Sequence, residues 1–208
     1  MFPEPPILFR EFAMDERLPL ATIHTAVLEY IKGRSDVAVF GAQAVNTYVD
    51  TPRMTQDIDL LCTCAETFAE ELREHLNQKF HVAVRVRCVA NGVGYRIYQV
   101  ATPRNRHLVD VRQVTAIPDC RTFQQISVVA PPELLAMKVV SMTARPGTPK
   151  GLTDEADILR LLLVFPEYKV AVGAVSNALA LLNADEQAIK VWLEFVERDI
   201  QPETDDEY

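Results

Sequence analysis

The sequence predicts an α+β fold in which helices flank a mixed β-sheet and a helical region follows. Over residues 1–130, short β-branched segments alternate with amphipathic ones, which indicates strands and helices in one core. Over residues 131–200, apolar residues recur at helical spacing only. We therefore expect an α/β core with an N-terminal helix (1–130), a helical C-terminal region (131–200) and an acidic tail without a regular element (201–208).

The elements of the core follow from apolar spacing and turn residues. A helix over 18–32 ends at Gly33, and a strand over 36–40 ends at Gly41. After these come a helix (43–49), a strand (57–64), a helix (66–79) and three strands (81–89, 95–101 and 107–114). The C-terminal region should contain helices at 133–143, 153–163, 169–182 and 185–196.

Composition narrows the classes of function. The 208 residues are 49% hydrophobic, which suffices for a stable core, and the formal net charge of −8 argues against a broad nucleic-acid-binding surface. The four cysteines show no zinc-site spacing, and Cys62 and Cys64 are interpreted as core-filling thiols. Residues 1–6 do not resemble a signal peptide, and no apolar stretch is long enough to span a membrane. We therefore expect a cytoplasmic protein without a membrane partner.

The strongest functional signal is the pair Asp57 and Asp59. Residues two apart on a strand share a face, so the two carboxylates should lie side by side and repel unless a hard cation such as Mg²⁺ neutralises them. Asp110 lies in another apolar strand, where a buried carboxylate needs a cation or hydrogen-bond donors. If the two strands are neighbours, the three acids converge and are enough to hold two Mg²⁺ ions for nucleotidyl transfer.

A resemblance to a known family rests on these motifs. Residues 39–48 and 53–60 resemble the core of the DNA polymerase beta-type nucleotidyltransferase superfamily. The chain is most similar to the branch of small bacterial abortive-infection and toxin–antitoxin nucleotidyltransferases. The resemblance covers roughly residues 35–165, including a helical segment at 132–138, and implies a nucleotidyltransferase-like sheet.

The resemblance also implies the site. The expected catalytic and metal-binding residues are Asp57, Asp59 and Asp110, with Mg²⁺ or Mn²⁺ as cofactor. The expected nucleotide-binding residues are Gly41, Ala42, Arg53, Thr55 and Lys138. The donor is a nucleoside triphosphate such as ATP, and the acceptor is a hydroxyl group of RNA, a protein or a small molecule. A cognate antitoxin-like protein is an expected partner.

Among the cations, Arg53 is expected to neutralise an adjacent carboxylate, and Lys138 to reach a phosphate as a point charge. Asp154 and Asp157 share one side of a helix and are expected to pair with nearby cations, Arg145 and Lys150, to fix the intervening loop. The segment 104–107, with His107, is interpreted as a solvated turn, and Asp110 is preferred as the group that takes the acceptor proton.

Two alternatives stay open. The chain departs from the family pattern at Ala42, where a second glycine or a serine is usual, which suits a fold that binds a nucleotide or a partner without turnover. The other alternative is an interaction module in which the acids pair with arginines such as Arg53 and Arg112. Arg112 lies two residues beyond Asp110 and therefore shares its face of a regular strand.

Overall fold

The computed structural model describes residues 18–202. Its strands are β1 (Val37–Phe40), β2 (Ile58–Cys62), β3 (Val84–Val89), β4 (Gly94–Gln99), β5 (Arg106–Gln113), β6 (Cys120–Phe123) and β7 (Ile126–Val129). Its helices are α2 (Leu20–Ile31), α3 (Gly41–Tyr48), α4 (Ala65–Phe80), α5 (Pro131–Thr143), α6 (Pro149–Val164), α7 (Ala174–Leu181) and α8 (Glu186–Glu197), with 3-10 turns η1 (Ala90–Gly92) and η2 (Pro166–Tyr168).

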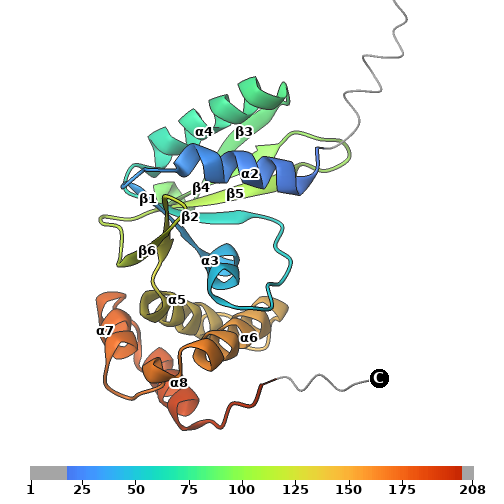
Figure 1. Cartoon of the computed structure of the whole chain (residues 1–208). Coiled ribbons are helices and arrows are strands. Elements are labelled where there is room, and N and C mark those ends of the chain that lie inside the picture. The colour runs from blue at the N-terminus through green and yellow to red at the C-terminus, as the bar shows by residue number, and fades with distance from the viewer. Residues whose placement is uncertain (1–17, 203–208) are drawn as a thin grey trace, which may run out of the picture.

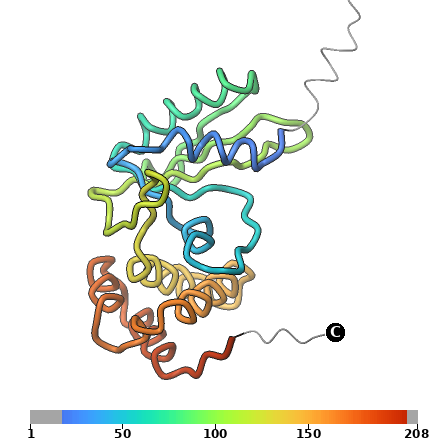
Figure 2. The backbone as a smooth tube through the Cα atoms, viewed as in Figure 1, coloured from blue at the N-terminus to red at the C-terminus, as the bar shows by residue number. Residues whose placement is uncertain are grey.

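The strands form one mixed sheet in the order β3-β4-β5-β2-β1-β7-β6. Helices α2 and α4 cover one face of this sheet, and α3 lies on the other, between the sheet and the C-terminal helices (Figure 1). The tube in Figure 2 shows how the chain leaves the sheet after β7 and continues into the helical region that ends with α8. The α+β class and the flanked mixed sheet predicted from the sequence are confirmed.

Burial on both faces explains the apolar runs of the central strands. All four residues of β1 are buried, and Ile58, Leu60 and Cys62 of β2 are fully enclosed. Strands covered on both faces carry continuous apolar runs instead of alternating ones. Within such a strand, the half-buried Asp59 is an exception that calls for a chemical reason.

The register of three strands places the polar residues of the sheet. Strand β1 pairs with β2 in antiparallel fashion, with Phe40 opposite Asp59. Strand β5 pairs with β2 in parallel fashion, with Asp110 opposite Asp59. Because Gly41 follows Phe40 directly, the first turn of α3 begins beside the two aspartates.

The β6–β7 hairpin was not predicted from the sequence. Its turn contains Gln124 and Gln125, both with positive φ (49° and 67°), whereas the usual signal for such a turn is Asn-Gly or Asp-Gly. Strand β7 is an internal strand of the sheet, because it pairs in parallel with β1 at Val128 and Val39 and in antiparallel fashion with the edge strand β6. Local sequence patterns carry no information about that pairing.

The helix predicted over 169–182 is shorter than expected. Residues 166–168 form a 3-10 turn, and α7 begins at Ala174 after the N-cap residue Gly173. The side chain of Ser176 exchanges hydrogen bonds with the backbone N–H and C=O of Gly173 (2.8 and 2.9 Å), which fixes this start. The other predicted elements are present, with bounds that differ by a few residues.

Two sequence expectations concern residues outside the described range: the absence of a signal peptide at 1–6, and the acidic tail beyond residue 202. None of the helices between residues 18 and 202 is both long and apolar enough to cross a membrane.

Candidate active site

A cleft of about 370 Å³ lies where the sheet meets α3, α5 and α6. All eight residues that the sequence analysis assigned to a site line this cleft: Gly41, Ala42, Arg53, Thr55, Asp57, Asp59, Asp110 and Lys138. They come from separate parts of the chain, and the strand register and helix packing bring them together. Their functional roles remain predictions.

Three aspartates form the acidic centre of the cleft. Asp59 on β2 and Asp110 on β5 are register partners, and Asp57 lies immediately before β2. Donor atoms of Asp57, Asp110 and His107 all lie within 4.8 Å of one another, as is required of groups that share one cation. Asp59 is not part of that group, but it lines the same cleft as Asp57 and Asp110, because β2 and β5 are neighbouring strands.

His107 belongs to this group and was missed by the sequence analysis, which placed it in a solvated turn. Its Nδ1 donates a hydrogen bond to Asp57 Oδ2 (2.9 Å), and its Nε2 lies 3.9 Å from Asp110 Oδ2. In a regular strand, residues three apart face opposite sides. The pairing of β4 with β5 shifts by one residue at Leu108, and this β-bulge turns His107 to the face of Asp110.

The acids of the cleft differ in electrostatic environment. The hydrogen bond from His107 is the main cause that lowers the pKa of Asp57. Burial, followed by the negative charges of Asp57 and Asp110, raises the pKa of Asp59 to about 6. Burial acts to lower the pKa of His107, but its hydrogen bond to Asp57 and the nearby negative charges outweigh burial and raise it. The centre thus carries an excess of negative charge.

Gly41 is required by the close approach of α3 to this centre. Its φ is +68°, and a Cβ atom at this position would overlap Asp59 Oδ2. Ala42, the next residue, is buried and lines the cleft. In the segment that precedes β2, Thr55 Oγ1 donates to the carbonyl of Asp57 (3.0 Å), and this hydrogen bond fixes how the chain enters the strand. The start of α3 therefore faces the acids with its backbone.

A second charged cluster forms the wall of the cleft on the side of α5 and α6. Lys138 is buried, and its Nζ donates to Asp154 Oδ1 (2.8 Å) and Asp157 Oδ2 (2.7 Å). Arg53 donates through Nε and Nη2 to the two oxygens of Asp157, at 2.8 Å each. Arg145 Nη2 donates to Asp154 Oδ2 (2.8 Å). With Arg160 Nη1 at 3.7 Å from Asp157 Oδ1, four cations share two carboxylates, which leaves an excess of positive charge in this wall.

These contacts change two expectations about ion pairs. Arg53 pairs with Asp157, far along the chain, instead of with Asp57 or Asp59. Asp154 pairs with Arg145 as expected, but the partners of Asp157 within 3 Å are Arg53 and Lys138 rather than Lys150. Pairing over such sequence separations has no local signal.

Asp110 pairs with Arg96 and not with Arg112, the arginine considered in the sequence analysis. Arg96 Nε lies 3.3 Å from both carboxylate oxygens of Asp110, because the two residues are register partners on β4 and β5. The guanidinium of Arg112 lies 5.0 Å from the centroid of the Phe40 ring. Arg96 thus compensates only part of the negative charge of the acidic centre. The pairs of the interaction-module alternative, in which Arg53 and Arg112 bind these acids, are not present.

Comparison with known proteins agrees with this geometry. The family described as "Nucleotidyl transferase AbiEii toxin, Type IV TA system" matches residues 32–207. No curated protein sequence has a significant match. Among solved structures, the Megavirus polyadenylate synthase is similar with a TM-score of 0.59 and 14% identity over 77% of this chain and 36% of that one. This chain therefore spans about a third of that enzyme, and the similarity shows a shared fold.

Two further structures have lower TM-scores. The antibiotic-resistance factor ANT(2'')-Ia has a TM-score of 0.49 and 13% identity, over 84% of this chain and 93% of that one. JHP933 from Helicobacter pylori has a TM-score of 0.48 and 11% identity, over 85% and 87%.

Proposed function

We propose that this chain, which belongs to the AbiEii nucleotidyl transferase toxin family, transfers a nucleoside monophosphate from a nucleoside triphosphate to a hydroxyl group and releases pyrophosphate. The observation that carries the proposal is the grouping of Asp57, Asp59 and Asp110 beside the start of α3. Carboxylates held together next to the N-terminus of a helix suit a reaction in which both a metal and a triphosphate must be placed.

The donor set fits Mg²⁺ or Mn²⁺. Hard divalent cations prefer carboxylate oxygens, and Asp57, Asp59 and Asp110 would hold them. The raised pKa of Asp59, caused by burial and by its two acidic neighbours, reflects an excess of negative charge that a divalent cation compensates. When bound, the metal supplies positive charge that polarises phosphate oxygens and favours ionisation of the acceptor hydroxyl.

The protein's own groups bind and orient the reactants. The N–H groups in the first turn of α3, including that of Ala42, are assigned to the triphosphate, because a helix N-terminus attracts phosphate through its amides and dipole. Lys138 and Arg53 belong to the wall with excess positive charge and stabilise the phosphates electrostatically. Asp110 accepts the proton of the acceptor hydroxyl, and His107 orients Asp57 through its hydrogen bond.

The test is transfer of label from α-labelled nucleoside triphosphates. Each of the four is incubated with Mg²⁺ or Mn²⁺ and a mixture of RNA, protein and small hydroxyl compounds, with the wild type or the double variant Asp57→Asn/Asp59→Asn. The exposed residue Asp50 provides a matched control, Asp50→Asn. Label transferred by the wild type and by the control, but not by the double variant, supports the proposal. Equal transfer by all three proteins contradicts it.

The same assay identifies the acceptor class, because the label marks the molecule that receives it. The family description names a toxin of a type IV toxin–antitoxin system, and we propose a toxin–antitoxin or phage-defence role with an antitoxin-like partner. Because the net charge of the chain is −8, we propose an acceptor that the protein can bind through a local basic patch. The end of an RNA, a protein side chain and a small molecule all meet this condition.

A second candidate function is binding of a nucleotide without transfer. Ala42 favours it, because this residue lies buried in the first turn of α3 and offers no hydroxyl to a phosphate. Calorimetric binding of a nucleoside triphosphate with Mg²⁺, combined with the absence of product in every acceptor mixture, selects this function over transfer.

A further inference from the structure

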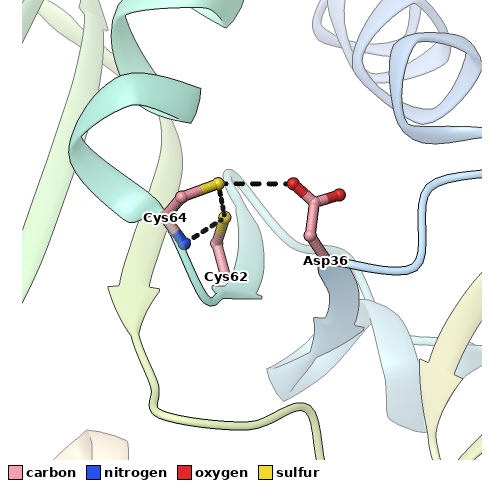
Figure 3. A group of neighbouring side chains, drawn as sticks. All are labelled: Asp36, Cys62 and Cys64. Atoms are coloured by element: carbon pink, nitrogen blue, oxygen red, sulfur yellow. Dashed lines mark hydrogen bonds between the residues drawn. The ribbon is translucent and has the colours of Figure 1, made fainter.

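A second group of metal-ligand side chains lies on the opposite face of the sheet from the acidic centre. Cys62 is the last residue of β2, three residues after Asp59, so it points to the face covered by α2 and α4. Cys64 is the N-cap residue of α4, and Asp36 lies directly before β1. Figure 3 shows the two sulfur atoms and one carboxylate oxygen turned toward one another.

The distances within this cluster match those of ligands around one tetrahedral ion. Cys62 Sγ and Cys64 Sγ are 3.7 Å apart, and Cys64 Sγ lies 3.3 Å from Asp36 Oδ2. Two thiolates bound tetrahedrally to Zn²⁺ at about 2.3 Å are about 3.8 Å apart, and a thiolate and a carboxylate oxygen are about 3.5 Å apart. The side chains therefore need little movement to coordinate such an ion.

Arg34 completes the charge balance of the cluster. Its Nε donates to Asp36 Oδ1 (3.0 Å) and its Nη2 donates to Asp36 Oδ2 (2.8 Å). A carboxylate oxygen has two acceptor sites, so the bond to Arg34 leaves one free for a metal. A divalent cation, two thiolates, one carboxylate and one guanidinium sum to zero charge, and Arg34 Nη1 also lies 3.4 Å from the more exposed Glu71 Oε2. Hydrogen bonds of this kind also orient a ligating carboxylate.

The environment suits a soft, divalent metal. The hydrogen bond from Arg34 lowers the pKa of Asp36 to about 2, so the carboxylate is ionised at neutral pH. The positive end of α4 favours an anionic ligand at Cys64. Burial raises the pKa of the Cys62 thiol, so a metal must displace its proton on binding. Cys64 is exposed, which gives an ion access and leaves a position for water.

We propose that Cys62, Cys64 and Asp36 form a binding site for a thiophilic divalent cation of the Zn²⁺ type, separate from the carboxylate site of the cleft. Thiolate ligands select Zn²⁺ over Mg²⁺, whereas the carboxylates of the cleft have the opposite preference. Cys62 lies in the buried core, as the sequence indicated, whereas Cys64 is exposed and does not fill the core. The inference does not depend on the proposed transferase activity.

Cobalt binding tests the proposal, because Co²⁺ replaces Zn²⁺ and absorbs by charge transfer only when thiolates ligate it. The full-length protein is stripped of metal, kept reduced with a phosphine and titrated with Co²⁺ and then with Zn²⁺. We expect a thiolate charge-transfer band that saturates at one equivalent of Co²⁺ and disappears on addition of Zn²⁺. The mass of the protein before titration verifies that Cys62 and Cys64 have not formed a disulfide.

Variants assign the band to this cluster. Cys64→Ser should abolish the band without disturbing the core, because the side chain is exposed. Arg34→Met, which removes the orienting hydrogen bonds, should weaken binding by about 10- to 100-fold. The matched control is Cys88→Ser, another exposed cysteine, which should leave the band unchanged. Absence of the band in the wild type, or its persistence in Cys64→Ser, overturns the proposal.

Discussion

Gly41 and Asp59 are packed so closely that any side chain at position 41 would overlap the carboxylate of Asp59. The contact joins the first residue of α3 to the second residue of β2 and sets how near the helix amides come to the acidic centre. Because φ of Gly41 is +68°, the position also requires a backbone conformation that residues with a Cβ rarely adopt.

Gly41→Ala should therefore reduce nucleotidyl transfer at least tenfold, because the new methyl group displaces Asp59. The backbone strain alone should cost about 1 kcal/mol of folding free energy. Gly33 separates the backbone strain from the displacement of Asp59. Its φ is +73°, but a Cβ atom there meets nothing within 4 Å. Gly33→Ala should show a similar loss of stability in urea unfolding and normal activity. Equal activities of the two variants would contradict the role of the contact.

The pKa of Asp59 predicts a pH-dependent cost to folding. Burial and two acidic neighbours raise it to about 6 in the folded chain, above the value of about 3.9 expected when the chain is unfolded. The folded state therefore binds the proton more tightly, and the cost of ionising Asp59 is absent below about pH 4 and fully present above about pH 6.

Asp59→Asn should consequently stabilise the metal-free protein at pH 8 by on the order of 1 kcal/mol and have little effect at pH 4. Asp57→Asn is the contrasting variant, because the pKa of Asp57 is lowered by the hydrogen bond from His107, and its loss should destabilise the fold at pH 8. Thermal unfolding with a chelator at both pH values measures the difference. A destabilising effect of Asp59→Asn at pH 8 would count against an uncompensated charge at this position.

The parts of the site that could be predicted from the sequence are those encoded locally. The spacing of Asp57 and Asp59 fixes their relation within one segment, and Gly41 directly ends the apolar run of β1. The prediction for Asp110 depended on which strands are neighbours, and the parallel pairing of β5 with β2 supplies that condition. The local pattern, together with the pairing of β2 and β5, places Asp57, Asp59 and Asp110 in one cleft.

The remaining features depend on irregular or distant contacts. The bulge at Leu108 reverses the face of His107, and no residue type marks it in the sequence. The Gln124-Gln125 turn lacks the glycine or asparagine by which hairpins are recognised. The pair formed by Arg53 and Asp157 joins segments that only tertiary packing brings together.

The buried carboxylate of Asp157 is expected to be the main ionic contribution to the packing of α6 against α5. Its side chain is 0% exposed and binds both Arg53 and Lys138, so Asp157→Ala would leave Arg53 without its carboxylate and Lys138 with Asp154 alone. Breaking a buried ion pair in this way costs about 3–5 kcal/mol. On the same helix, Glu155 pairs with Arg198 at the surface, and Glu155→Ala should cost less than about 1 kcal/mol.

The difference in folding free energy between the wild type and Asp157→Ala should also depend on pH. Burial acts to raise the pKa of Asp157, but the hydrogen bonds and charges of Arg53 and Lys138 outweigh it and lower the pKa. The stabilisation is therefore present above the unfolded-state pKa of about 3.9 and is lost as the pH falls through the lower folded-state value. Urea unfolding from pH 7 to pH 3 measures it, and a difference between wild type and Asp157→Ala that grows toward pH 3 would contradict this assignment.

His107 is expected to act on catalysis through the position of Asp57. Replacing the imidazole by an apolar side chain in His107→Leu removes the donor to Asp57 Oδ2 and should lower nucleotidyl transfer about tenfold. His107→Asn retains an N–H donor at a comparable distance from the backbone and should restore most of the rate. If His107 instead exchanged protons with the acceptor, both variants would lose activity to the same degree, because an amide does not titrate. The pH–rate profile of His107→Asn then decides the matter: an unchanged acidic limb agrees with positioning, and loss of that limb identifies proton transfer by the imidazole.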